Sequence, residues 1–359
     1  MTTAERSQLI SEVGEEIITK EDLSKLLESG DELIAYDGFE PSGQIHIAQG
    51  ILRTINVNKM TKAGVHFKML VADWHAYANN KMGGDLERIQ TVGKYFIEVW
   101  KACGMDLSHV EFVWASDLVK DPDYWKLVLQ ISKTNSLKRF VRTAEIMGRD
   151  ESMDLTAAQI IYPCMQTADI FTLGAKITQL GMDQRKVNML AREIGQQLGF
   201  WKPVVVSHHM LMGLNQPPEA SGEDKTSRTI AIKMSKSHPD SAIYMTDTTD
   251  DIKRKILKAW APEGIIIENP ILEYCKYILF EVFNEIKIER PDKFGGPITY
   301  KTYKDLEQDY ANKSLHPLDL KRAVIQLLDQ LLEPVRKHFK DNNEAAALLE
   351  KVRSFQITR

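Results

Sequence analysis

Cysteine is scarce in this sequence. Its 359 residues include only three, at Cys103, Cys164 and Cys275. They are far apart, odd in number and not at the spacing of metal ligands, which favours reduced core thiols in a cytosolic protein. Long hydrophobic runs are also missing, since no stretch approaches the roughly 20 apolar residues of a membrane span. The N-terminal residues lack the basic and apolar regions of a signal peptide. We therefore expect a cytoplasmic protein with no membrane partner.

An excess of positive charge is missing as well. The 46 Lys and Arg residues are outnumbered by 50 Asp and Glu residues, which gives a net charge of −4. This balance argues against broad non-specific binding of nucleic acid, but it allows a local basic face that binds one folded RNA. No GxGxxG fingerprint follows the first apolar run, which weakens an interpretation as a dinucleotide-dependent dehydrogenase.

What is present is an alternation of apolar runs with helical patterns. Strands are expected at Leu33–Tyr36, His66–Asp73, Val110–Trp114 and Val204–Ser207. Helices are expected at Leu86–Ala102, Asp123–Phe140, Ala157–Ile170 and Gln184–Leu198. This alternation predicts a doubly wound parallel sheet, with polar residues at the C-terminal strand ends facing a ligand crevice. Residues before about position 30 are expected to be helical and peripheral.

The composition changes after about Ile243. Four further stretches have helical patterns: Asp250–Trp260, Glu273–Ile286, Thr302–Tyr310 and Pro317–Phe339. A chain of 359 residues is long enough for two domains. We expect an α/β domain over residues 1–243 and a smaller all-helical domain over residues 244–359.

The stretch from Tyr36 to Gly50 combines a strand end, a turn and a helix start. Pro41-Ser42-Gly43 is a turn by composition, because proline restricts φ and glycine permits positive φ. A turn leading into a helix presents free backbone N–H groups, which suit an anion. His46 is expected at the helix start, where its imidazole can donate to a phosphate. The alternative is an ordinary turn with a surface histidine.

A second stretch, Lys233-Met234-Ser235-Lys236-Ser237, places two lysines three residues apart among small hydroxyl residues. It suits the binding of a polyphosphate by a movable loop. The alternative is a solvated basic loop.

Two stretches in the middle carry polar groups that need partners. Tyr162, Gln166 and Asp169 lie at offsets of four and three, so they share one face of an otherwise apolar helix. They either satisfy one another in the core or line a pocket for a small polar ligand. Asp183 and Gln184 follow the stretch Ile177–Leu180 and open the next helix, as a cap or as part of a site.

Together these motifs resemble the paired signatures of class I aminoacyl-tRNA synthetases, His-x-Gly-His and Lys-Met-Ser-Lys-Ser. The second signature is matched completely. The first is matched at His46 alone, because Ala48 and Gln49 stand where the family has glycine and a second histidine. From about Tyr36 to the C-terminus the chain resembles the archaeal and eukaryotic type of tyrosyl-tRNA synthetase. The stretches that carry this resemblance are residues 39–43, 72–76, 162–169, 182–186 and 316–321.

The resemblance implies a Rossmann-like catalytic domain, a helical anticodon-binding domain and a homodimer. It places a dimerising insertion at about residues 107–146 and a mobile loop at 233–237. It also implies that L-tyrosine is activated with ATP to tyrosyl-adenylate and transferred to tRNA(Tyr). Mg²⁺ is expected to arrive with ATP and to have no dedicated protein site.

The resemblance assigns roles to individual residues. It implies that Tyr36 and Asp169 contact the phenolic hydroxyl of the substrate. The ammonium and carboxylate of the substrate would be contacted by Tyr162, Gln166 and Gln184. The phosphates would be held by His46, Gln49, Lys233 and Lys236, and the ribose by Asp183. Further ATP contacts are expected from Gly43, Ala48, Met210, Leu211 and Ser235. The tRNA would be contacted at its acceptor stem by Arg142 and Arg185, and at its anticodon by Phe294, His316 and Asp319.

Three alternatives remain open. The tryptophanyl enzyme shares the fold and signatures, but Tyr36 and Asp169 favour a phenol over an indole. A catalytically silent tRNA-binding or signalling descendant would not need the intact phosphate-binding residues. A nucleotidyltransferase that uses no tRNA would not need the helical domain. Pyrophosphate exchange and tRNA charging distinguish these alternatives.

Overall fold

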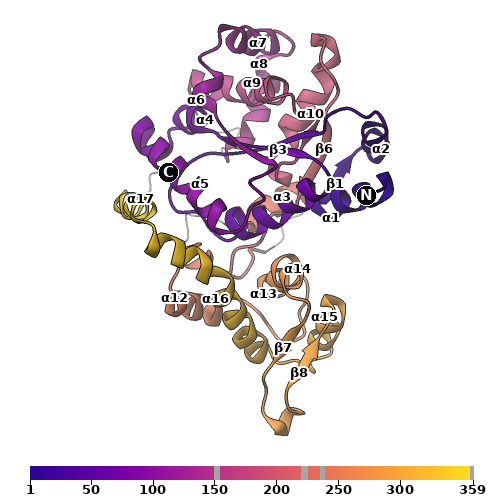
Figure 1. The fold of residues 1–359 in the computed structure, drawn as a ribbon, viewed down its shortest axis with the longest axis vertical. Helices are drawn as coiled ribbons and strands as arrows, with labels where there is room; N and C mark the ends of the chain where they lie inside the picture. The colour runs from indigo at the N-terminus through magenta and orange to yellow at the C-terminus, as the bar shows by residue number, and fades with distance from the viewer. Residues whose placement is uncertain (149–153, 220–224, 235–238, 356–359) are drawn as a thin grey trace.

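The computed structural model describes residues 1–148, 154–219, 225–234 and 239–355 (Figure 1). The main sheet contains β1 (Gly14–Ile18), β2 (Ile34–Phe39), β3 (His66–Val71), β4 (Val110–Trp114), β5 (Ile177–Thr178) and β6 (Val204–His208). The helices associated with it are α1 (Thr3–Val13), α2 (Lys20–Glu28), α3 (Arg53–Lys62), α4 (Asp73–Ala78), α5 (Leu86–Ala102), α6 (Ala115–Leu118), α7 (Pro122–Ser132), α8 (Leu137–Thr143), α9 (Ala157–Thr172), α10 (Arg185–Ile194) and α11 (Lys225–Ile232). None of the helices in these described ranges combines the length and the apolar character that crossing a bilayer requires.

The six strands lie in the order β1-β6-β5-β2-β3-β4, and all pairs except β1·β6 are parallel. The strand order therefore reverses between β2 and β5, where ligands bind in open α/β sheets. Alternate side chains enter two separate cores: Phe67 packs with α3 and α5, and Leu70 packs with α7 and α9. Helices thus cover both faces of the sheet. The prediction of a doubly wound, Rossmann-like sheet is confirmed.

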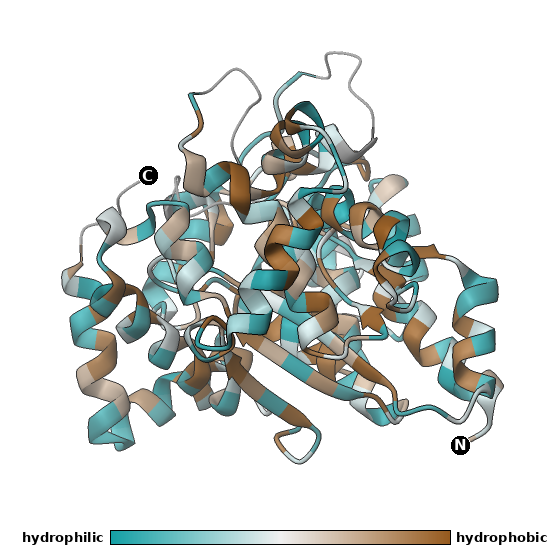
Figure 2. Cartoon of the chain, turned by 90° about the horizontal axis from the view of Figure 1, so that it is seen from above, coloured by the Kyte–Doolittle hydropathy of each residue, from teal (hydrophilic) through white to brown (hydrophobic). Residues whose placement is uncertain are grey.

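Hydropathy explains how these elements pack. Figure 2 shows helices with hydrophilic and hydrophobic stripes around central strands that are largely hydrophobic. Strands buried on both faces are expected to be continuously apolar, and β6 begins with three buried valines, Val204, Val205 and Val206. Helix α5 has the bounds expected from its pattern, with the Asp85 side chain capping its first turn by accepting from the Arg88 N–H.

Two local expectations need correction. Residues 14–18 are not helical: they form β1, which pairs antiparallel with the edge of β6. A single helix over Asp123–Phe140 is also wrong, because α7 ends at Ser132 and α8 begins at Leu137. The break contains Thr134, whose hydroxyl donates to the Ile131 carbonyl at 2.7 Å, and short polar side chains of this kind compete with helical hydrogen bonding.

The C-terminal part lies below the main sheet in Figure 1. It contains α12 (Thr249–Lys258), α13 (Pro270–Tyr274), α14 (Phe280–Val282), α15 (Tyr303–Ala311), α16 (Pro317–Asp341) and α17 (Asn343–Ser354). Its description as all-helical needs one correction, since β7 (Ile286–Ile288) and β8 (Ile298–Tyr300) form a two-stranded antiparallel sheet. Ile286 and Ile288 are buried while Lys287 is exposed, an alternation of period two that favours a strand.

The long helix α16 returns the chain to the first half of the molecule. The ring of Phe339 lies 5.4 Å from that of Tyr95 on α5, and His338 Nε2 lies 2.8 Å from Glu98 Oε2. Helix α17, which the sequence analysis did not anticipate, packs Leu349 into the same core as α5. The domain boundary at residues 243 and 244 stays a prediction.

Candidate active site

A cavity of about 510 Å³ opens at the C-terminal edge of the main sheet. It is lined by the ends of β2 and β6 and by the segment that follows β5, which places it at the reversal of strand order. Its size is typical of a pocket for a small molecule. The residues singled out from the sequence that line it are Tyr36, His46, Ala48, Gln49, Tyr162, Gln166, Asp169, Asp183, Gln184, Met210, Leu211 and Lys233.

One end of the cavity is a buried polar cluster around Asp169. Its Oδ1 accepts from the Tyr124 hydroxyl at 2.9 Å, and its Oδ2 lies 2.9 Å from His75 Nε2. Burial lowers the pKa of His75, but the charge and hydrogen bond of Asp169, together with the charges of Glu40 and Asp73, more than offset this, and the net shift is upward. His75 therefore carries a positive charge more readily than an ordinary histidine and balances Asp169.

The hydroxyl of Tyr36 belongs to the same end of the cavity. It is buried and forms no hydrogen bond of normal geometry within the described ranges, although the Gln166 side chain is near enough to offset part of the burial-driven rise in its pKa. Burial raises the pKa of Tyr36 well above its usual value, and the negative charge of Asp169 raises it further. Tyr36 is thus a neutral phenol with a free hydrogen-bonding group. Buried polar groups normally have a partner, so this end of the cavity is suited to a ligand that carries one.

The middle of the cavity presents amide and carboxylate groups. Gln166 Nε2 donates to Gln184 Oε1, and Gln184 Nε2 donates to the Ile146 carbonyl, both at 3.1 Å. This leaves Gln166 Oε1 buried and without a partner in the described chain. Glu40 also lines the cavity, and its two oxygens accept from Asn79 Nδ2 at 3.0 and 3.2 Å. An unpaired acceptor beside a carboxylate suits an ammonium group.

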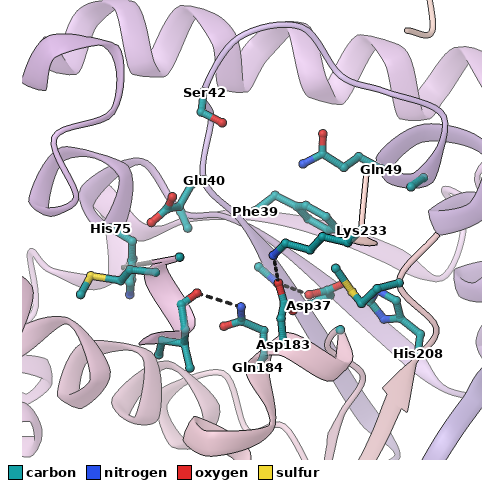
Figure 3. A pocket seen from close by; sticks show the side chains of 18 of the residues that line it. Asp37, Phe39, Glu40, Ser42, Gln49, His75, Asp183, Gln184, His208 and Lys233 are labelled. Atoms are coloured by element: carbon teal, nitrogen blue, oxygen red, sulfur yellow. Dashed lines mark hydrogen bonds and ion pairs between the residues drawn. The ribbon is translucent and has the colours of Figure 1, made fainter. Parts of the chain in front are cut away.

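The other end of the cavity carries Lys233. Figure 3 shows its side chain reaching Asp183, and its Nζ lies 2.6 Å from Asp183 Oδ2. The backbone of Lys233 pairs antiparallel with Met212, and the Met234 N–H donates to the Leu211 carbonyl at 2.8 Å. Lys233 is therefore held by a short backbone pairing at the rim of the cavity.

The turn at Gly43 brings His46 to the same end. Gly43 has a φ of 108°, which favours glycine, and it does not itself line the cavity. His46 does not begin a helix as expected: it pairs with Tyr244, and the helical turn begins at Ala48. The reason is a local pairing of segments distant in sequence, in which the Ile47 N–H donates to the Ile243 carbonyl at 2.8 Å.

Comparison with known proteins supports the same interpretation as the geometry of the cavity. The family model for class I tRNA synthetases (W and Y) matches residues 28–333. The chain belongs to this family. It is 49% identical over 357 residues to the tyrosine–tRNA ligase 1, cytoplasmic, of Arabidopsis thaliana, covering 99% of this chain and 89% of that protein. It is 43% identical to the tyrosine–tRNA ligase of Thermococcus sibiricus, covering 96% of each.

Solved structures of the family show the same architecture. The tyrosyl-tRNA synthetase of Pyrococcus horikoshii, crystallised with L-tyrosine, superposes with a TM-score of 0.91 at 40% identity and covers 98% of this chain and 100% of its own. The tryptophanyl-tRNA synthetase of Aeropyrum pernix superposes with a TM-score of 0.65 at 19% identity, covering 94% of this chain and 86% of its own, which shows a shared fold only.

The residues singled out for tRNA contact do not line the cavity. Arg185 pairs with Glu16 at 2.8 Å, and Arg142 is exposed on α8. His316 caps α16 by accepting from the Leu318 N–H, and Asp319 lies 3.5 Å from Arg322. Phe294 lies in the turn Asp292–Phe294 between β7 and β8. Ser235 and Lys236 lie outside the described residues.

The sequence analysis missed several residues of the cavity and its surroundings. His75 occurs in a stretch quoted only for its resemblance, and Glu40 occurs in another. Nothing in the local sequence pattern indicated that Tyr124 and His208 would lie at or near the cavity. These residues come from the end of β2 and from α4, α7 and β6, which only the folded chain brings near one another.

His209, which also lines the cavity, joins three segments of the synthetase chain. Its Nδ1 lies 3.0 Å from Glu15 Oε2 and its Nε2 lies 3.1 Å from Glu273 Oε2, while its ring stacks on Tyr277. Glu273 also accepts from the Met212 N–H at 2.9 Å. Burial lowers the pKa of His209, but hydrogen bonds and charge from both glutamates raise it to about 9. The imidazolium thus stabilises the folded chain.

This pairing predicts a pH dependence of stability. Because the pKa of His209 is raised on folding, its contribution is complete below about pH 6.5 and is lost as pH rises through about 9. The contribution is up to ~3 kcal/mol at low pH. Urea unfolding of wild type and His209→Gln at pH 6, 7.5 and 9 measures it. The stability difference between the two proteins should shrink as pH rises, and a difference independent of pH would contradict the assignment.

Proposed function

We propose that the chain is a tyrosine–tRNA ligase. In this reaction L-tyrosine and ATP form tyrosyl-adenylate and pyrophosphate, and the tyrosyl group is then transferred to the 3′-terminal ribose of tRNA(Tyr) with release of AMP. The family assignment and the names of its relatives support this function. The single observation that carries it is the buried, unpartnered Tyr36 hydroxyl at the Asp169 end of the cavity.

That end of the cavity fits a phenol. A substrate hydroxyl can donate to Asp169 and accept from Tyr36, so all three groups would be satisfied. Phenylalanine would leave these buried groups unpaired, and a site of this type rejects the analogue without the hydroxyl by ~10⁴–10⁵-fold. The indole of tryptophan has a donor N–H but no acceptor for Tyr36. The tryptophanyl alternative is therefore disfavoured by the same observation.

The rest of the cavity suits the activation step. Tyr162, Gln166 and Gln184 are proposed to hold the ammonium and carboxylate of tyrosine. The tyrosine carboxylate, already an anion, attacks the α-phosphorus of ATP, and the bond to the pyrophosphate oxygen breaks. No general base is needed. The negative charge that develops on the phosphates is stabilised by preorganised donors and cations.

The phosphate end is proposed to consist of residues from both signatures. His46, Gln49, Lys233 and Lys236 would bind the phosphates, and Asp183 would accept from the ribose. The remaining ATP contacts are proposed for Gly43, Ala48, Met210, Leu211 and Ser235. Within the described ranges, no group of three or more His, Cys, Asp and Glu side chains is arranged to hold a metal ion. Mg²⁺ is proposed to enter with the ATP phosphates.

Residues outside the cavity are proposed to contact tRNA. Arg142 and Arg185 would reach the acceptor stem, and Phe294, His316 and Asp319 would contact the anticodon. The last three lie on the C-terminal part, residues 244–359, which is proposed to be the anticodon-binding domain. A cytoplasmic location is proposed from the name of the Arabidopsis relative.

We also propose a homodimer formed by the insertion at about residues 107–146. Its exposed surface carries large apolar side chains: Leu107 is 46% exposed, Leu129 64% and Leu137 62%. Ile161 on α9, which packs against α7, is 41% exposed. A face of this kind is typical of a protein–protein contact, and a second copy is the occupant that the family resemblance indicates.

The dimer leads to a direct prediction. Leu129→Asp should convert the protein to a monomer, because a charge in an apolar interface loses its hydration without a partner. Light scattering after size-exclusion chromatography measures the mass. Ile267→Asp, at an apolar residue that is 76% exposed and outside the insertion, is the matched control and should not change it. A wild-type protein that elutes as a monomer would exclude this interface.

The function is tested by amino-acid-dependent exchange of labelled pyrophosphate into ATP, with tyrosine, tryptophan and phenylalanine compared side by side. Exchange with tyrosine alone is expected. Exchange with tryptophan alone would contradict the assignment of Tyr36 and Asp169. Absence of exchange from folded protein with Mg²⁺ would favour the silent binder, with Gln49 as the first residue to examine. Charging of tRNA excludes the nucleotidyltransferase alternative.

A further inference from the structure

Glu268 and Glu273, in the C-terminal part of the chain, reach the segments that hold Lys233. Between them Asn269 caps α13, which lies at the end of the C-terminal part that faces the main sheet (Figure 1). Neither glutamate lines the cavity, and their side chains are mostly buried, at 27% and 17% exposed. Their partners therefore indicate what these two carboxylates do.

Glu273 holds the segment that pairs with Lys233. Its Oε2 accepts from the Met212 N–H at 2.9 Å, and Met212 pairs antiparallel with Lys233. The next residue continues this pairing, because the Gly213 N–H donates to the Ile232 carbonyl at 3.0 Å. A carboxylate that accepts from a backbone N–H forms a charge-assisted hydrogen bond, which is stronger than one between neutral groups. Glu273 thus fixes the backbone against which Lys233 is placed.

Glu268 holds the helix that leads into Lys233. Arg228 lies on α11, which ends one residue before Lys233. Its Nε lies 2.7 Å from Glu268 Oε1 and its Nη2 lies 2.5 Å from Glu268 Oε2. Two parallel contacts between planar groups restrict orientation as well as distance. The Lys233 N–H donates to the Thr229 carbonyl at 3.1 Å, so the position of Lys233 follows that of α11.

The stretch that carries both glutamates is itself fixed in the C-terminal part. Asn269, which is 1% exposed, donates from Nδ2 to the Ile265 carbonyl at 2.9 Å and to the Tyr310 hydroxyl at 3.3 Å. Glu268 has a φ of 52°, a left-handed conformation that is uncommon for residues other than glycine. Such conformations persist where the surrounding contacts over-determine them, and they gather at functional sites.

We propose that Glu268 and Glu273 are positioning residues that hold Lys233 in place at the rim of the cavity. Each carboxylate holds one of the two segments that meet at Lys233, whose Nζ lies 2.6 Å from Asp183 Oδ2. The role of Lys233 in tyrosine activation rests on the proposed function, whereas the attachment of its two supporting segments does not. Misplacing a reacting or stabilising group by about 1 Å can cost roughly 10²-fold in rate, so contacts outside the cavity affect the reaction.

Single-turnover formation of the adenylate tests the path through Lys233. Glu273→Ala and Glu268→Ala should each slow it by about 10–10²-fold and leave the affinity for tyrosine unchanged. In a Lys233→Ala background the same substitutions should cause almost no further loss, because they act through the group already removed. Glu273→Gln keeps an oxygen that can accept from the Met212 N–H, so it should recover part of the rate. An equal loss in both backgrounds would overturn the proposal.

Glu281→Ala is the matched control. Glu281, on α14, also joins the C-terminal part to the first half of the molecule, since its Oε2 lies 2.6 Å from Lys59 Nζ on α3. Its side chain is 34% exposed, close to that of Glu268. The control should form the adenylate at the wild-type rate. A loss as large as that in Glu273→Ala would mean that any contact between the two parts supports the reaction, which contradicts a specific role for Glu268 and Glu273.

Amide hydrogen exchange separates this inference from the proposed function, because it needs no substrate. Exchange should become about tenfold faster in residues 225–234 of Glu268→Ala and in residues 211–213 of Glu273→Ala, since local opening is less costly there. Glu281→Ala should exchange as wild type in both segments. Faster exchange supports the inference even if no amino acid promotes pyrophosphate exchange, in which case only the ligase function has failed. Wild-type exchange in both glutamate variants overturns the inference and leaves the ligase function intact.

Discussion

Replacing Lys233 by alanine should slow the formation of tyrosyl-adenylate by about 10²–10³-fold, the effect expected when a preorganised group that stabilises transition-state charge is removed. Figure 3 shows Lys233 across the pocket from His75, the partner of Asp169, so the affinity for tyrosine should change little. In the ligand-free protein Lys233 is paired with Asp183 at 2.6 Å. In the proposed complex the ribose would engage Asp183, and the ammonium group would then be available to the phosphates.

Single-turnover formation of the adenylate and equilibrium binding of tyrosine measure the two quantities separately. Lys101→Ala is a suitable control, because Lys101 is a partly exposed lysine paired with Glu98 on α5 and is not part of the cavity lining. It should behave as wild type. An unchanged activation rate in Lys233→Ala would rule out the assignment, and an equal loss of tyrosine affinity would indicate a collapse of the cavity.

The second large effect is expected on amino-acid selectivity. Asp169→Asn should lower kcat/KM for tyrosine by about 10²–10³-fold and affect phenylalanine far less, because the hydroxyl loses its charged acceptor. The substitution also removes the counter-charge of His75, whose side chain is 1% exposed. Breaking a buried pair costs stability by roughly 3–5 kcal/mol, so folding must be measured in parallel.

The substitution Tyr36→Phe tests recognition of the substrate hydroxyl without an expected loss of folding stability. The Tyr36 hydroxyl has no partner in the described chain, so its removal leaves no protein group unsatisfied and the melting temperature should not fall. Selectivity for tyrosine over phenylalanine should still decrease, by about tenfold or more. A parallel decrease for both amino acids in both variants would show that these residues support the fold and do not recognise the hydroxyl.

The proposed selectivity for tyrosine depends on groups that come from separate parts of the chain. Tyr36 is on β2, His75 on α4, Tyr124 on α7 and Asp169 on α9. The sequence analysis identified Tyr36 and Asp169 from a strand end and a helix face. It could not identify His75 and Tyr124, because no local periodicity connects them to Asp169.

The sequence by itself determined the elements whose signals are local. Alternating apolar runs and helical patterns predicted β4 and α5 with their observed bounds, and the strand–helix alternation predicted the parallel sheet. The spacing of Tyr162, Gln166 and Asp169 placed all three on one helix face, and they do line the cavity. These signals are reliable because backbone geometry fixes which side chains share a face.

Only the tertiary structure decided the contacts between distant segments. Residues 14–18 became a strand because the edge of β6 was available for pairing, and His46 entered a pairing with Tyr244 in place of a helix. His208 Nδ1 lies 3.1 Å from nitrogens of both Arg53 and Gln179, which are 155 and 29 residues away in sequence. Local propensity carries no information on such partners, because strand order and packing bring them together only after the chain has folded.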